Sequence, residues 1–203
     1  MAVSYKRKMK KIRIKDITLT AMFIALGIVL PFLTGQIPKI GSMMLPMHLP
    51  IMLCGLILGW KYGLIAGIVT PILRSFIFGM PPLFPSAVAM AFELAAYGAV
   101  IGLIFNKIKW RCIYTILFSL SVAMIAGRIV WGAVSYLLFN ITAKSFTFTM
   151  FLSSAIINAI PGIILQFILI PSIMLLLKRS HIIQLTPKKH KTLSSIKEEV
   201  SEG

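Results

Sequence analysis

Six long apolar runs, separated by short stretches rich in glycine, proline or charge, dominate this sequence. A helix needs about 20 apolar residues to cross the hydrocarbon core of a bilayer, with a range of about 17–25. The runs cover residues 17–34, 48–59, 63–79, 86–105, 112–139 and 149–177. Only 13% of the residues are charged and the mean hydropathy is +0.93, whereas soluble domains contain about 25% charged residues. The sequence therefore predicts an all-α integral membrane protein with six transmembrane helices.

The positive charges are distributed unevenly between the two ends of these helices. Seventeen of the 21 lysines and arginines fall in the N-terminal arm, the second-to-third turn, the fourth-to-fifth loop or the C-terminal side, and only Lys39 and Lys144 fall in the opposite loops. Cytoplasmic loops carry an excess of Lys and Arg, so both termini are expected in the cytoplasm. The expected division is a basic arm over residues 1–16, a membrane domain over 17–178 and a disordered cytoplasmic tail over 179–203.

Two series of small residues recur at a spacing of four. The glycines Gly55, Gly59, Gly63 and Gly67 cross the stretch 60–62, which we interpret as a turn, and predict tight packing of two adjacent helices. Ala21 and Ala25, with Gly27 nearby, form a second series on the first helix. This smooth patch either packs internally or docks another membrane protein.

Three charged residues fall inside predicted spans: Arg74, Glu93 and Arg128. An ionised side chain at the bilayer centre costs roughly 2.5–3.5 kcal/mol and tends to face a cavity or a partner. Glu93 can pair with only one arginine at a time, which leaves one positive charge without a carboxylate. Either that arginine extends to a membrane interface, or an anionic ligand completes the site.

Neutral polar side chains extend this candidate site over three helices. Glu93 and Tyr97 share one helix face, Arg128, Trp131 and Ser135 a second, and Asn158, Gly162 and Gln166 a third. The predicted ligand-binding residues are Arg128, Glu93, Asn158, Gln166, Trp131, Tyr97, Arg74 and, in the first external loop, Lys39. The alternative is that these groups only bond one helix to another. His48 is interpreted as a structural histidine, since no second metal ligand lies at a suitable spacing.

Several functional classes are excluded by the sequence. It contains no phosphate-binding loop, no metalloprotease or nucleophile-elbow motif and no paired membrane carboxylates. We therefore expect no enzyme activity, no cofactor and no metal. Because the basic residues stand in blocks between apolar runs, nucleic-acid binding is not expected either.

The overall pattern resembles the S component, the substrate-binding membrane subunit, of energy-coupling factor (ECF) vitamin transporters. The resemblance covers residues 10–180 and rests on the basic arm, the segment Thr20–Ala25, the glycine series around Trp60–Tyr62, and Asn158 and Pro161. It implies six helices in a prokaryotic cell membrane, a vitamin-like ligand bound from outside, and a first external loop that closes the site. It also implies that Ala21 and Ala25 dock onto a transmembrane T component, which two cytoplasmic ATPases drive.

The resemblance is nearest to the pantothenate-type and folate-type branch, through residues 47–50, 79–82 and 91–95. Both ligands are carboxylates, and pantothenate is the favoured candidate. Two other functions stay open from the sequence: a stand-alone carrier that uses Glu93 as a proton site, and a membrane scaffold without a ligand.

Overall fold

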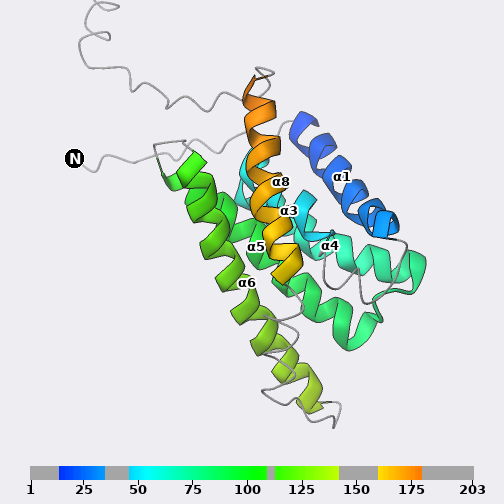
Figure 1. The fold of residues 1–203 in the computed structure, drawn as a ribbon. Helices are drawn as coiled ribbons and strands as arrows, with labels where there is room; N and C mark the ends of the chain where they lie inside the picture. Colours follow the sequence, from blue (N-terminus) through cyan, green and yellow to red (C-terminus); the bar gives the residue numbers. More distant parts are fainter. Residues whose placement is uncertain (1–13, 35–45, 109–112, 142–159, 180–203) are drawn as a thin grey trace, which may run out of the picture.

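The computed structural model describes residues 14–34, 46–108, 113–141 and 160–179, and these residues are almost entirely helical (Figure 1). The helices are α1 (Ile14–Val29) with a 3-10 extension (Leu30–Thr34), α3 (His48–Leu58), α4 (Trp60–Phe78), α5 (Val88–Lys107), α6 (Ile113–Ile141) and α8 (Ile160–Arg179). A short irregular helix, Leu83–Ala87, leads into α5. The predicted all-α class is confirmed.

Five of these segments are long and apolar enough to cross a membrane: 14–32, 60–78, 83–107, 113–140 and 160–177. The described residues thus form a multi-pass membrane protein. The sixth apolar helix, α3, has 11 residues and a length of only about 17 Å. The six-span arrangement and the cytoplasmic termini therefore remain predictions. The first described turn of α1 and the last of α8 lie at the same end of the bundle (Figure 1).

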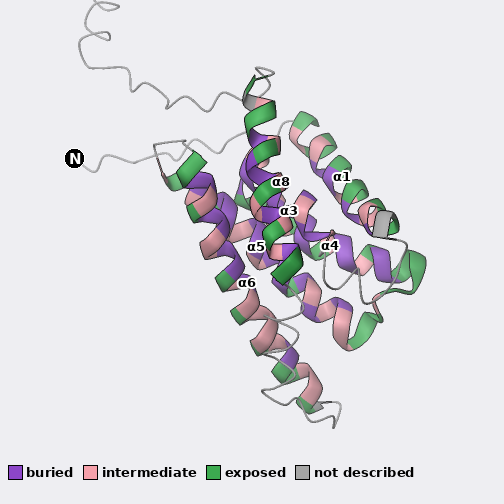
Figure 2. Ribbon diagram, in the orientation of Figure 1, coloured by how far each residue is buried: buried purple, intermediate pink, exposed green. Residues whose placement is uncertain are grey.

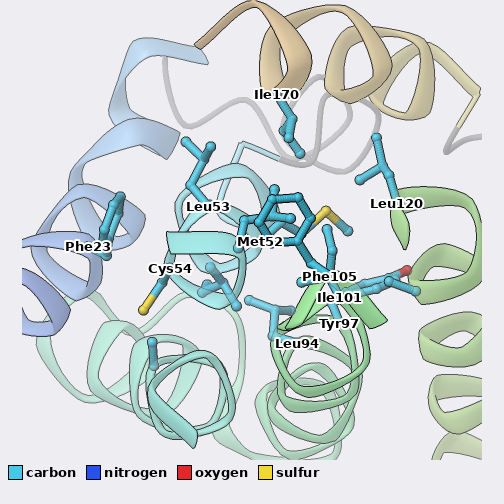
Figure 3. Packing of buried hydrophobic residues seen from close by; sticks show 14 of the residues in the cluster. Phe23, Met52, Leu53, Cys54, Leu94, Tyr97, Ile101, Phe105, Leu120 and Ile170 are labelled. Carbon is cyan, nitrogen blue, oxygen red and sulfur yellow. The ribbon is translucent and has the colours of Figure 1, made fainter. Parts of the chain in front are cut away.

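The short helix α3 lies inside the bundle, where it needs no lipid-facing surface. Eight of its residues are buried: His48, Pro50, Ile51, Met52, Leu53, Cys54, Gly55 and Leu56. Figure 2 shows the buried surface concentrated on α3 and on the inner faces of its neighbours. In Figure 3, side chains of α1, α3, α5, α6 and α8 meet in one hydrophobic cluster, with Met52 near its middle.

Glycines allow α3 and α4 to pack backbone-to-backbone against α5. A Cβ on Gly55 would lie 2.5 Å from the Gly98 carbonyl oxygen, and one on Gly67 would lie 2.5 Å from the Ala95 nitrogen. Neither distance is possible for a real side chain, so only glycine fits. The predicted tight packing of this series is confirmed, and α5 is its main partner.

The break between α3 and α4 is shorter than the sequence suggested. Gly59 alone interrupts the helix, with φ of 99° and ψ of 173°, and Trp60 already begins α4. The expected turn at residues 60–62 is therefore wrong, since these residues form the first turn of α4. A positive φ is accessible to glycine at little cost, so one residue suffices to redirect the chain.

Candidate functional site

The carboxylate of Glu93 is the centre of a polar cluster inside the bundle. Glu93 lies on α5 and is 2% exposed. Its Oε1 accepts a hydrogen bond from the Tyr97 hydroxyl at 2.9 Å and pairs with Arg128 Nη1 at 3.1 Å. His48 Nε2 lies 3.7 Å from the same oxygen, which is too long for a hydrogen bond. We call these four residues the Glu93 cluster.

Three helices supply the cluster, and their spacing explains how. Glu93 and Tyr97 are four residues apart, so their side chains lie on one face of α5. Arg128 comes from α6, and His48 is the first residue of α3. A Cβ on Gly127 would lie 2.6 Å from Tyr97 Cδ1, so this glycine lets the tyrosine ring lie flat against α6. In Figure 3 the Tyr97 oxygen points toward α6.

The charges in the cluster balance. Glu93 carries one negative charge and Arg128 one positive charge at 3.1 Å. The Arg128 side chain is 16% exposed and that of Glu93 is 3% exposed, so little water screens the pair. Removing one partner from a buried pair leaves an uncompensated charge, which is strongly destabilising. The pair therefore fixes α5 against α6 at this depth.

Several polar atoms on α3, α6 and α8 are buried and have no hydrogen-bond partner among the described residues. They are His48 Nδ1 and Nε2, Arg128 Nη2, Ser135 Oγ, and Gln166 Nε2 and Oε1. A buried polar group without a partner costs about 1–3 kcal/mol, and native proteins contain few of them. His48 and Arg128 belong to the Glu93 cluster, Ser135 lies two turns after Arg128 on α6, and Gln166 lies on α8. These groups give the interior of the bundle an unused capacity for hydrogen bonding, which a small polar ligand can fill.

Arg74 makes a different set of contacts. Its Nε donates to the Met80 carbonyl at 3.1 Å and its Nη1 donates to the Ile28 carbonyl at 3.1 Å. Its guanidinium also lies 5.8 Å from the centre of the Phe32 ring. Arg74 is 7% exposed, and among the described residues it forms no ion pair. Arg74 thus joins the C-terminal end of α1 to the turn after α4. The arginine that pairs with Glu93 is Arg128.

The remaining predicted ligand residues divide into two groups. Trp131 is half-buried on α6, one turn after Arg128, and Gln166 is buried on α8. Lys39 and Asn158 lie outside the described residues, so their predicted roles stay untested. The sequence-based interpretation took His48 as a structural histidine and did not place it in the cluster, and it did not name Gly127. A histidine at the start of a short, wholly apolar helix and a glycine directly before a membrane arginine are the signals that could have found them.

Ala21 and Ala25, the predicted docking residues, are both exposed on α1. Gly27 does not belong to this patch, contrary to the sequence-based expectation. It is buried, and a Cβ on it would lie 2.7 Å from the Thr70 γ-methyl group. Gly27 lies two residues after Ala25, and two residues turn a helix by about 200°, so it lies on the opposite face.

No metal site is present in the described part of the chain, where no three His, Cys, Asp or Glu side chains lie together. Cys54 is a free, buried thiol in α3. The Glu93 cluster contains a single carboxylate and a single imidazole, which is fewer ligands than a metal site needs. Its arrangement suits binding of an organic ligand better than coordination of a cation.

Comparison with known proteins identifies the family of this chain and does not bear on the Glu93 cluster. No curated protein and no solved structure matches the chain significantly. A family model described as "ECF transporter, substrate-specific component" matches residues 15–174. This range includes all the helices described above apart from the first residue of α1 and the last turn of α8. The chain therefore belongs to the family of ECF transporter substrate-specific components.

Proposed function

We propose that this chain captures a small, vitamin-like organic molecule from outside a prokaryotic cell membrane at the Glu93 cluster. Membership of the family implies partnership with a T component and ATPases, and binding rather than catalysis. The observation that carries the proposal is the set of buried polar atoms that lack hydrogen-bond partners in the described bundle, three of which belong to His48 and Arg128 of the Glu93 cluster. A merely structural cluster would be expected to satisfy its own hydrogen bonds.

Pantothenate is the first candidate ligand, on the strength of the sequence resemblance. The sequence suggested that an arginine without a carboxylate partner would bind the carboxylate of pantothenate. The structure supports this contact less directly, because Glu93 already pairs with Arg128. Arg74, for its part, donates hydrogen bonds to two backbone carbonyl groups. Arg128 Nη2 has no hydrogen-bond partner in the described part of the chain and remains the proposed contact for a ligand oxygen. Lys39 and Asn158 complete the proposed site, with Trp131 as an aromatic wall.

The test is calorimetric binding of a vitamin panel that includes pantothenate, folic acid and riboflavin to the purified chain in detergent. If no vitamin of the panel binds, the result would favour a membrane scaffold without a ligand. Proton-coupled uptake into liposomes by the chain alone would instead favour the stand-alone carrier. Binding without uptake, and uptake only after addition of a T component and two ATPases, is the expected result.

Arg128 offers the sharpest variant pair for this assay. Arg128→Ala removes both the ligand contact and the partner of Glu93, so binding is expected to fall by about 2–5 kcal/mol and the protein to lose stability. Arg128→Lys keeps a positive charge for Glu93 but removes Nη2. We expect Arg128→Lys to fold and still to bind at least about tenfold more weakly, which is about 1.4 kcal/mol. Ser172→Ala is the control, because its exposed hydroxyl bonds only within α8, to the Ile168 carbonyl.

A further inference from the structure

Gln166 is a buried side chain of α8 whose amide lacks any partner in the described bundle. It is 1% exposed, and among the described residues neither its Nε2 nor its Oε1 has a hydrogen-bond partner. His48 also lacks hydrogen bonds, but its Nε2 lies 3.7 Å from Glu93 Oε1. Ile170 and Met174, one and two turns later, are 0% exposed. Gln166 therefore belongs to the face of α8 that points into the bundle, where an amide is costly unless something bonds to it.

The height of Gln166 in the bundle follows from helix directions. His48 lies by Glu93 and Tyr97, whereas Gly55 lies by Gly98, so α3 and α5 run the same way. Arg128 of α6 lies by Glu93 and the preceding residue, Gly127, lies by Tyr97, so α6 runs opposite to α5. In Figure 1, α8 in turn runs opposite to α6. Hence α3, α5 and α8 all run in one direction.

Ile170 joins the same hydrophobic cluster as Met52 and Leu120 (Figure 3). Gln166 is one turn, about 6 Å, before Ile170, and His48 is one turn before Met52. Because the two helices run the same way, Gln166 lies toward the end of the bundle where His48 and the Glu93 cluster lie. Gln166 is thus a buried residue of α8 on the cluster's side of the hydrophobic core.

An amide presents a donor and an acceptor side by side in one plane. A partner that satisfies both must itself carry an acceptor next to a donor, as a ring lactam, a ureido group or a hydroxyl beside a carbonyl does. A carboxylate offers only acceptors at neutral pH and leaves Oε1 without a partner. The balanced Glu93–Arg128 pair adds no net charge that would call for an anion here.

We propose that Gln166 determines specificity by binding an uncharged donor–acceptor edge of the ligand. The proposal rests on the proposed function, since it names which part of the vitamin-like molecule enters the bundle. The charged end of such a molecule is then held elsewhere. A ligand without the donor leaves a buried amide oxygen unpaired, and sites of this kind reject such analogues strongly.

The test couples a protein change to a ligand change. Three probe pairs are titrated: pantothenate and its analogue lacking the hydroxyl beside the carbonyl, folic acid and its N3-methyl derivative, and riboflavin and its N3-methyl derivative. Each pair is measured with the wild-type chain, with Gln166→Met, and with Ile170→Met as a matched control on the same face of α8. The methionine variants keep the side-chain volume nearly constant.

For the pair whose parent compound binds, the wild type and Ile170→Met are expected to lose at least about tenfold in affinity on removal of the donor. Gln166→Met is expected to bind both members of the pair equally. Equal losses in Gln166→Met and in the wild type would overturn the inference and leave the proposed function standing. If no vitamin of the full panel binds the wild type, the proposed function itself fails. A structural role for Gln166 would lower affinity for both members and preserve their ratio.

Discussion

The inner helices α3, α4 and α5 and the outer helix α1 use small residues at the same spacing in opposite ways. Gly55, Gly63 and Gly67 press directly against the backbone of α5. Ala21 and Ala25 on α1 are exposed. The spacing alone predicts close helix approach in both places, and only burial separates an approach made within the chain from one left for another molecule.

Gly98→Ala is expected to have the largest effect. A Cβ on Gly98 would lie 2.9 Å from Gly63 Cα and closer still to its carbonyl group. Because backbone rather than a flexible side chain stands in the way, α4 and α5 must separate, at a cost of about 3 kcal/mol or more. The measurement is thermal unfolding of the purified protein in detergent. A melting temperature equal to that of the wild type would show that the inner helices are less tightly packed than described.

Arg74 links the two regions and is expected to have the second largest effect. Arg74→Met removes the bonds to the Met80 and Ile28 carbonyls, and a hydrogen bond to a charged group contributes about 1.5–3 kcal/mol. Arg74→Lys keeps the charge, but one ammonium group cannot reproduce the planar fork. Unfolding measurements on both variants should therefore show that lysine recovers little of the loss. Full recovery by lysine would mean that charge, not geometry, joins α1 to α4.

The helices and their contacts show which features of this protein can be predicted from its sequence and which cannot. Periodic apolar runs predicted the helices well, because burying apolar surface and satisfying the backbone leave few alternatives in a membrane. The pairing of Glu93 and Tyr97 followed from helix geometry alone. Which arginine meets Glu93 could not be predicted, because that depends on the relative heights of helices far apart in the sequence. Likewise, the sequence placed Gly27 in the exposed patch with Ala21 and Ala25, whereas it packs against Thr70 of α4, and the position of Thr70 could not be predicted.

Gly27→Ala is expected to change stability little, which sharpens the contrast with Gly98. The added Cβ meets the γ-methyl group of Thr70 at 2.7 Å, and a side chain can move where a backbone cannot. Moving it strains the hydrogen bond from Thr70 Oγ1 to the Ala66 carbonyl, now 2.7 Å long. Alanine also gains about 0.5–1 kcal/mol over glycine within a helix. The net change in unfolding free energy is expected to stay within about 1 kcal/mol, measured as for Gly98→Ala. A loss as large as that of Gly98→Ala would show that α1 packs as rigidly as the inner helices.

Ala21→Leu and Ala25→Leu are expected to have the smallest effect on stability and a large one on transport. Both positions are exposed, so their unfolding free energies should remain within about 0.5 kcal/mol of the wild type. If α1 docks onto the T component through these alanines, each leucine holds the two helices apart. Vitamin uptake by cells that co-express the T component and both ATPases should then fall more than tenfold, about 1.4 kcal/mol, while binding to the isolated chain is unchanged. Leu26→Phe is the control, since it enlarges an exposed side chain about 140° from Ala21 and about 100° from Ala25 around the helix. Normal uptake by both leucine variants would remove α1 from the docking surface, whereas lost uptake in all three variants would point to a general effect of bulk on α1. If the leucine variants keep the unfolding free energy of the wild type but lose vitamin uptake, the small residues of this surface serve contact with a partner. If the unfolding free energy falls as well, they serve packing within the chain.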